Sequence, residues 1–179
     1  MRFTTMFRQS VRELKNSKSL VTAAMLVAVG VVLSAYATIR VTQEFQVSFG
    51  YLASGMIAML FGPVVNAAAG LVTDIVSYVL YTDGPYCFWF ALNPMMSGLI
   101  FAFFFYGKKV TLPKAIGAKL LDTLVVEIGM TSLWLVMLYG AKGWMWFAVR
   151  AGWKLAAFVV QAPVLYIVLK TVEKAKRKF

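Results

Sequence analysis

The sequence predicts an all-α integral membrane protein, a six-helix bundle with both termini on the cytoplasmic side. Three observations indicate this class. Of the 179 residues, 61% are hydrophobic and only 14% are charged, whereas soluble domains carry roughly 25% charged residues. The apolar residues form about six runs near membrane length, since one helical crossing needs about 20 of them. The basic residues gather in three clusters, which six crossings would place on one face.

The predicted spans follow one another through short connections. The first covers about residues 20–39 and the second about 49–61, which is short for a crossing unless it starts near Val47. Gly62 and Pro63 then predict a tight inner turn. The other four spans are expected at about 64–81, 90–106, 115–139 and 144–169. The outer connections at 40–49, 82–89 and 140–143 suit lids over a pocket that opens outward.

The charge pattern orients these spans. Five basic residues precede the first span, four lie between the fourth and fifth, and five end the chain, 14 of the 18 in all. The positive-inside rule makes that face cytoplasmic. Although the net charge is +11, contact with membrane lipid headgroups explains the clusters better than nucleic acid does. We therefore expect a basic cytoplasmic segment at 1–19, a transmembrane domain at 20–170 and a basic cytoplasmic tail at 171–179.

Metal and disulfide chemistry are not expected. Cys87 is the only cysteine and the sequence has no histidine, so no internal disulfide can form and no zinc or haem site is predicted. We expect no cofactor. The charge bias and the lack of cysteine pairs fit a multi-pass protein of the bacterial plasma membrane.

Small residues line the first predicted span. Ala24 and Ala28 lie one helical turn apart, and such a stripe lets another helix approach closely. The stripe is either an internal seam of the bundle or a docking surface for a partner. Periodicity alone favours the seam.

Ionisable residues inside the predicted spans each need a partner or a function. They are Asp74 in the third span, Asp122 and Glu127 in the fifth, and Arg150 and Lys154 in the sixth. Arg150 and Lys154 lie on one helical face, so something negative is expected opposite them. One hypothesis is an ion pair between helices; the other is an anionic ligand that Arg150 binds through two hydrogen bonds. We favour pairing for Lys154 and Asp122, and both hypotheses stand for Arg150.

Aromatic residues concentrate in the predicted outer connections. An interfacial belt explains many of them. However, Tyr86, Phe88 and Phe90 stand close to Asn93 in the sequence, and this combines stacking rings with an amide that both donates and accepts hydrogen bonds. The mixture suits a flat, polar heterocycle.

Six short segments together form a more specific pattern. They are FGYL at 49–52, MLFGPVV at 59–65, GLVTD at 70–74, TDGP at 82–85 with FALN at 90–93, SLWL at 132–135, and Val149-Arg150 with Lys154. In these segments the chain, from about residue 20 to 170, resembles the substrate-binding subunits (S-components) of energy-coupling factor (ECF) vitamin importers, and within them the folate family.

The resemblance implies a non-enzymatic bundle that binds one vitamin near the outer face. The sequence has no ATPase motif of the form G-x-x-x-x-G-K-(S/T), and the implied partners are a transmembrane coupling protein (the T-component) and two ECF ATPases that bind the ATP. Import would occur by toppling of the loaded subunit in the membrane. In the family, an Ala-x-x-x-Ala stripe on the first helix docks the coupling protein. Ala24 and Ala28 match it, which reverses the preference for an internal seam.

The resemblance also implies ligand-binding roles, with folate as the expected ligand. The candidates are rings that stack on the pterin and aminobenzoate groups, amides that hydrogen-bond the pterin, and cations near the glutamate carboxylates. They are, respectively, Phe49, Tyr86, Phe88, Phe90 and Trp134; Gln46 and Asn93; and Arg40 or Arg150. Lys154 is a further substrate-binding candidate. Ala35 and Gln46 stand where the family often carries arginine, and Thr131 stands where it carries asparagine; Arg40 could replace a lost cation.

Three alternatives accompany this prediction. The chain could be an S-component for another carboxylated vitamin such as pantothenate, which ligand affinity would distinguish. A small membrane enzyme with Asp74 or Glu127 as general base is disfavoured, because paired catalytic groups and metal ligands are lacking. A channel or structural bundle is disfavoured because the aromatic and amide residues fall in outer connections rather than along a pore.

Overall fold

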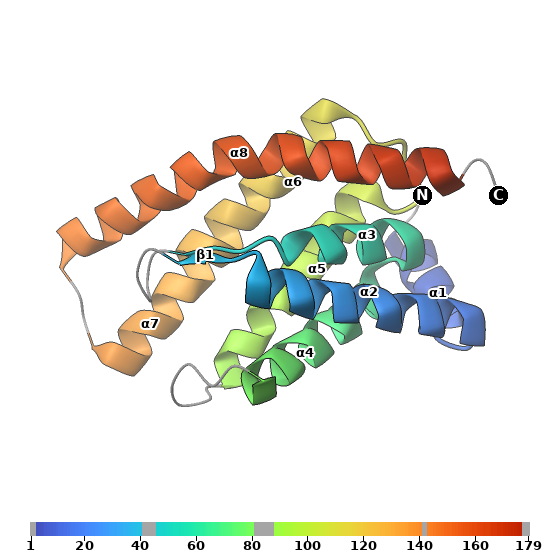
Figure 1. Cartoon of the computed structure of the whole chain (residues 1–179), viewed down its shortest axis with the longest axis horizontal. Helices are drawn as coiled ribbons and strands as arrows, with labels where there is room; N and C mark the ends of the chain where they lie inside the picture. Colours follow the sequence, from blue (N-terminus) through green and yellow to red (C-terminus); the bar gives the residue numbers. More distant parts are fainter. Residues whose placement is uncertain (1–2, 41–45, 81–87, 141–142, 177–179) are drawn as a thin grey trace.

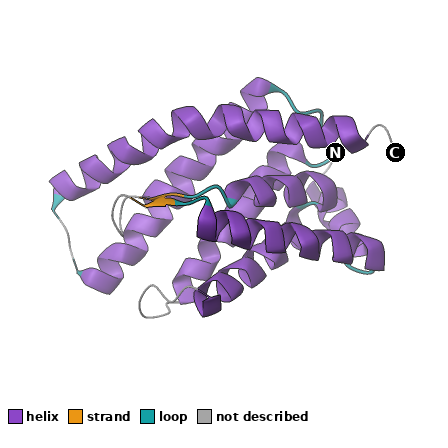
Figure 2. Ribbon diagram, viewed as in Figure 1, coloured by secondary structure: helices purple, strands orange, loops and turns teal. Residues whose placement is uncertain are grey.

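The chain folds as a helical bundle with one short β pair (Figures 1 and 2). The structure is a computed structural model that describes residues 3–40, 46–80, 88–140 and 143–176. In chain order its elements are α1 (Phe3–Glu13), α2 (Ser17–Tyr36), β1 (Ile39–Arg40), β2 (Gln46–Val47), α3 (Tyr51–Phe61), α4 (Pro63–Leu80), the 3₁₀ helix η1 (Phe88–Ala91), α5 (Leu92–Phe105), α6 (Leu112–Asp122), the π-helix η2 (Thr123–Met130), α7 (Thr131–Tyr139) and α8 (Trp144–Lys176).

The predicted fold class, an all-α membrane bundle, is confirmed. Within the described ranges, five helical segments are long and apolar enough to cross a bilayer, and they are Ser17–Tyr36, Pro63–Leu80, Phe88–Phe105, Leu112–Leu138 and Trp144–Ala175. Each falls within a few residues of a predicted span. Many of their apolar side chains are exposed, such as Val79 on α4 and Val159 on α8, as expected for surfaces that face lipid.

The second predicted span is short in the structure as well. Helix α3 has eleven residues, so it is only about 16 Å long, against a hydrocarbon core of about 30 Å. The β pair precedes it, with Ile39 opposite Val47 and Arg40 opposite Gln46. Backbone groups inside a membrane must be hydrogen-bonded within the protein. Because α3 is too short to span the membrane, the β pair supplies hydrogen bonds for part of the chain that precedes it.

One end of the bundle carries the basic residues. Helix α1 and the last turns of α8 lie at this end in Figure 1. The connection between α5 and α6, which contains Lys108 and Lys109, is held to α8 because the backbone N–H of Val110 donates to Glu173 Oε2 at 3.2 Å. The three predicted basic clusters therefore meet at one end, as an even number of crossings requires.

Helix α1 was not predicted, and it seals this basic end. Ser10, which is fully buried, donates to the carbonyl of Phe61 at 2.7 Å and accepts from the backbone N–H groups of Val64 and Val65. It thereby satisfies backbone groups that the α3–α4 turn leaves unpaired. The turn itself needs Gly62, whose φ of 86° is a left-handed conformation that other residues rarely adopt.

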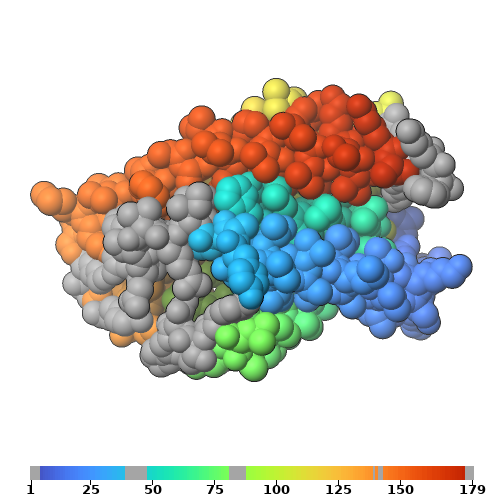
Figure 3. All heavy atoms as spheres, in the orientation of Figure 1, coloured from blue at the N-terminus to red at the C-terminus, as the bar shows by residue number. Residues whose placement is uncertain are grey.

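The core sits where α3, α5, α6 and α8 meet. Its largest buried side chains include Phe101 and Phe105 on α5, and Leu165 and Leu169 on α8. Helix α8 forms one long edge of the molecule (Figure 3). A cavity lies in the half of the bundle away from the basic end.

Candidate functional site

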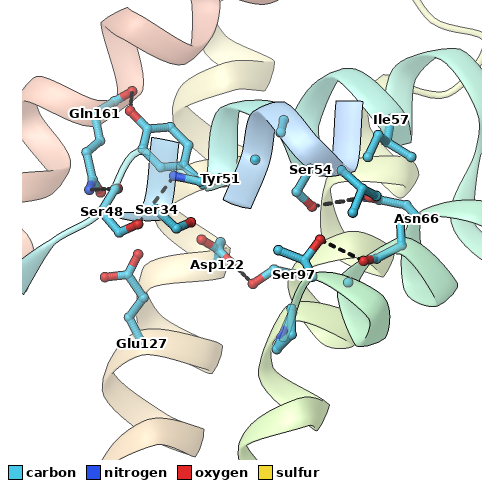
Figure 4. A pocket seen from close by; sticks show the side chains of 18 of the residues that line it. Ser34, Ser48, Tyr51, Ser54, Ile57, Asn66, Ser97, Asp122, Glu127 and Gln161 are labelled. Atoms are coloured by element: carbon cyan, nitrogen blue, oxygen red, sulfur yellow. Dashed lines mark hydrogen bonds between the residues drawn. The ribbon is translucent and has the colours of Figure 1, made fainter. Parts of the chain in front are cut away.

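A cavity of about 270 Å³ lies between the helices in the half away from the basic end. Its walls come from α2, α3, α4, α5, α6, η2 and α8, so segments from most of the chain converge on it (Figure 4). Most of the lining is apolar, and polar groups are set into it: four serine hydroxyls together with an asparagine, a glutamine and two carboxylates. These residues are Ser34, Ser48, Ser54, Ser97, Asn66, Gln161, Asp122 and Glu127.

Close helix packing positions these side chains. A Cβ added to Gly70 on α4 would come within 2.9 Å of the Pro94 backbone on α5, so only glycine permits this approach. Next to it, Asn66 is almost fully buried; its amide donates to the carbonyl of Gly98 and to the hydroxyl of Ser54, both at 3.2 Å. The polar wall is thus fixed by hydrogen bonds between α3, α4 and α5.

A buried ion-pair network forms the other wall. Lys119, fully buried on α6, lies 2.9 Å from Asp122 and 2.5 Å from Glu127. Lys154 on α8 lies 3.0 Å from the second oxygen of Glu127. The hydroxyl of Ser97 donates to Asp122 at 2.5 Å. The negative groups expected opposite the sixth span are therefore present, and Glu127 ties that span to the fifth.

The π-helix η2 carries Glu127 and links it to the outer end of the bundle. In this segment the N–H of Thr131 bonds to the carbonyl of Val126, five residues back, and π-segments within α-helices are frequent at functional sites. Lys119 and Glu127 are eight residues apart, whereas side chains on one helix are expected to pair at a spacing of about three or four residues. The sequence therefore did not predict this ion pair.

Arg150 is committed to protein groups. It is 4% exposed, its Nε donates to Ser132 Oγ at 3.2 Å, and one Nη donates to the backbone carbonyl of Glu127 at 3.3 Å. Its guanidinium also lies 5.8 Å from the ring centroid of Trp146. Arg150 is absent from the cavity lining, so it braces η2 against α7 and α8 from behind.

The predicted aromatic and amide residues meet near the outer end. Asn93 donates to Thr131 Oγ1 at 3.1 Å and accepts from Trp134 Nε1 at 3.0 Å. Trp134 stacks on Trp89, with ring centroids 5.6 Å apart. Phe90 is half-buried, whereas Phe88 is 63% exposed. Asn93 and Trp134 are thus brought together, although neither lines the cavity.

The other predicted site residues are placed as follows. Phe49 is half-buried and lies 6.2 Å from Tyr51, ring to ring. Arg40 and Gln46 face each other in the β pair through their backbones. Tyr86 lies outside the described residues. Among the predicted ligand-binding residues whose side chains the structure describes, Lys154 is the one found in the lining of this cavity.

Sequence reasoning missed most of the cavity wall. Gln161, Ser97 and Asn66 are polar residues within apolar spans, and this was the available signal, although uncharged polar residues in a membrane helix serve packing as readily as binding. Tyr51 belongs to the segment at 49–52 but was not predicted as a site residue. In the structure its hydroxyl donates to the backbone carbonyl of Gln161 at 3.1 Å, and Lys119 Nζ lies 4.6 Å from its ring centroid.

The chain combines helices long enough to cross a bilayer, a basic end and an internal cavity with several polar groups. These features define a multi-pass membrane protein that can hold a small molecule. The chain matches the family model "ECF transporter, substrate-specific component" over residues 18–172. It therefore belongs to the family of ECF transporter substrate-specific components, and its predicted membership in that family is confirmed.

Individual relatives agree with this assignment. The chain is 26% identical to the folate transporter FolT of Clostridium novyi (strain NT) over 161 residues, 90% of this chain and 93% of the relative. It is 29% identical to the FolT of Leuconostoc mesenteroides over 160 residues, covering 86% and 85%. A solved structure, "Crystal structure of FolT bound with folic acid", superposes with a TM-score of 0.80 at 30% identity, covering 86% of this chain and 93% of the other.

Proposed function

We propose that this chain is the folate-binding subunit of an ECF importer. The superposition on a FolT structure that holds folic acid carries the proposal, because it combines 30% identity with nearly complete coverage of both chains. The cavity supports it: small-molecule sites are concave and few per protein, with a small number of placed polar groups, and this cavity has that character.

In this proposal the subunit captures folate at the outer face of a bacterial plasma membrane and binds no ATP. A T-component and two ECF ATPases supply the energy, and the loaded subunit topples in the membrane to release folate inside. The exposed positions of Ala24 and Ala28 on α2 support a docking surface, since α2 packs within the bundle through other residues, namely Ala23, Gly30 and Val31.

Titration of the purified protein in detergent tests the ligand. We expect folic acid to bind tightly and to quench tryptophan fluorescence, because Trp89 and Trp134 stack near the outer end. Pantothenate serves as the matched carboxylated vitamin and should give no response. A response to pantothenate but not to folic acid would replace the vitamin while keeping the class; a response to neither, in folded protein, would reject both ligands.

A further inference from the structure

Helix α1 presents three stripes of side chains along its length. Residues three or four apart lie on the same face of a helix, and α1 with the turn that follows it contains three such sets. One stripe faces the bundle, one is apolar and partly exposed, and one is basic and exposed. The bundle-facing, apolar and basic stripes are, respectively, Met6, Ser10 and Glu13; Phe7, Val11 and Leu14; and Arg8, Arg12 and Lys15. Successive stripes are about 100° apart around the helix axis, so the apolar stripe lies between the other two.

The bundle-facing stripe fixes how α1 is rotated. Met6 is 4% exposed and Ser10 is fully buried, and the Ser10 hydroxyl donates to the carbonyl of Phe61 in the α3–α4 turn. Glu13 accepts from the Ser19 hydroxyl at 2.6 Å, which ties the end of α1 to the start of α2. Because this stripe is held inward, the apolar and basic stripes face away from the bundle.

The apolar stripe lies at the edge of the membrane. Helix α2 is long enough to cross the bilayer and begins at Ser17, a few residues after α1 ends. In Figure 1, α1 is turned away from the direction of α2. Val11 and Leu14 are 44% and 37% exposed, so the bundle covers this stripe only in part. Apolar surface gains free energy on leaving water, and the boundary between headgroups and acyl chains is the apolar region that a helix at this position reaches.

The basic stripe lacks a negative partner within the described part of the chain. Its three cations are exposed and make no ion pair there. Glu13, the one acidic residue of α1, lies on the bundle-facing stripe. The positive-inside rule explains on which side of the membrane these cations lie, but it does not explain their alignment beside an apolar stripe. Helices that lie in the membrane interface have this combination, and anionic headgroups supply the complementary charge.

We propose that α1 is an interfacial helix whose basic stripe binds the phosphate-bearing headgroups of anionic phospholipids. The apolar stripe then rests at the acyl-chain boundary of the same leaflet. Because Ser10 joins α1 to the α3–α4 turn, lipid bound to α1 also holds the basic end of the bundle closed. This surface is distinct from the cavity and takes a different partner from the vitamin.

Hydrogen exchange of the full chain in lipid nanodiscs tests this contact. One nanodisc contains phosphatidylcholine alone, and the other contains phosphatidylcholine mixed with anionic phosphatidylglycerol. Amides of α1, and the N–H of Val64 that bonds to Ser10, should exchange about tenfold more slowly with phosphatidylglycerol, because each Lys or Arg near an anionic surface adds to the attraction. Arg8→Gln/Arg12→Gln/Lys15→Gln should remove this difference.

Two control variants separate the stripes from charge in general. Lys109→Gln/Lys170→Gln/Lys174→Gln removes the same charge from exposed positions at the basic end and should keep the slower exchange of α1. Val11→Ser/Leu14→Ser keeps every cation but should lose most of the slowing, because α1 can no longer rest in the interface. Inorganic phosphate added to the phosphatidylcholine nanodiscs should not slow exchange, since a free anion does not seat the apolar stripe.

Equal exchange of wild-type α1 in the two nanodiscs would overturn the proposal, and this comparison needs no variant. Slowing that persists without the basic or the apolar stripe, that is lost in the lysine control, or that inorganic phosphate reproduces would overturn it as well. Slowing that appears only when the coupling module is added would assign this face to a protein partner instead. Exchange in the core of α5 should be alike in all variants, which verifies that each one is folded.

Discussion

Lys119 shows how a membrane bundle can contain a fully buried charge. Its ammonium group contacts the carboxylates of Asp122 and Glu127 and the ring face of Tyr51. A lone cation inside a membrane protein is costly, and removing one member of a buried pair leaves the other uncompensated. Lys119 is absent from the cavity lining, so it organises the wall of the cavity from behind.

Replacement of Lys119 should be strongly destabilising. In Lys119→Met the buried carboxylate of Asp122 loses its cation, and Glu127 keeps only Lys154, so we expect a loss of about 3 to 5 kcal/mol. For a chain of this size that lowers the unfolding midpoint by roughly 6 to 20 °C, which a thermal melt in detergent measures. Lys174→Met is the matched control: Lys174 is exposed near the end of α8, and its loss should change stability by less than about 0.5 kcal/mol. Similar melts for the two variants would contradict the network.

Helix α2 has a buried face and an exposed face. Its buried residues, Ala23, Gly30 and Val31, pack within the bundle, and a Cβ on Gly30 would come within 2.9 Å of Ala53 on α3. Ala24 and Ala28 are exposed along the flank of this buried face. The internal seam that periodicity favoured is therefore formed by neighbouring small residues, and the Ala24–Ala28 stripe stays available to a partner helix.

Bulk on this stripe should separate docking from binding. In the Ala24→Trp/Ala28→Trp double variant we expect folate uptake with the coupling module to fall to background, because a partner helix can no longer approach. The folic acid affinity of the isolated subunit should not change. Val72→Trp/Val76→Trp places the same bulk on exposed positions of α4 and should transport normally. Loss of ligand affinity in the alanine variant would indicate a packing role instead.

At the scale of the whole molecule, the basic clusters and the cavity lie in different halves of the bundle. The basic end is closed by α1 through Ser10 and by the contact between Val110 and Glu173, while the cavity lies in the other half. Release of a ligand from this cavity toward the basic end requires a rearrangement, because α1 and the α5–α6 connection close that end. This arrangement fits the proposed need for a separate coupling module.

The fold was predictable because lipid imposes a simple rule. Long apolar runs must be helices, so span boundaries near Gly62 and Trp144 could be placed from the sequence. The cavity could not be predicted. A polar residue in a membrane helix, such as Gln161 or Ser97, can either line a cavity or pack against another helix, and the sequence does not show which of the two lies next to it. The ion pair between Lys119 and Glu127 joins positions whose contact depends on η2, and nothing in the sequence announced a π-helix there.

Transport of labelled folate into vesicles tests the central claim most directly. The chain alone should bind folic acid without accumulating it, and accumulation should appear only when the T-component and the two ATPases are present with ATP. Accumulation by the chain alone, or binding without any accumulation in the complete complex, would contradict the proposal that this bundle is the folate-capturing subunit of an ECF importer.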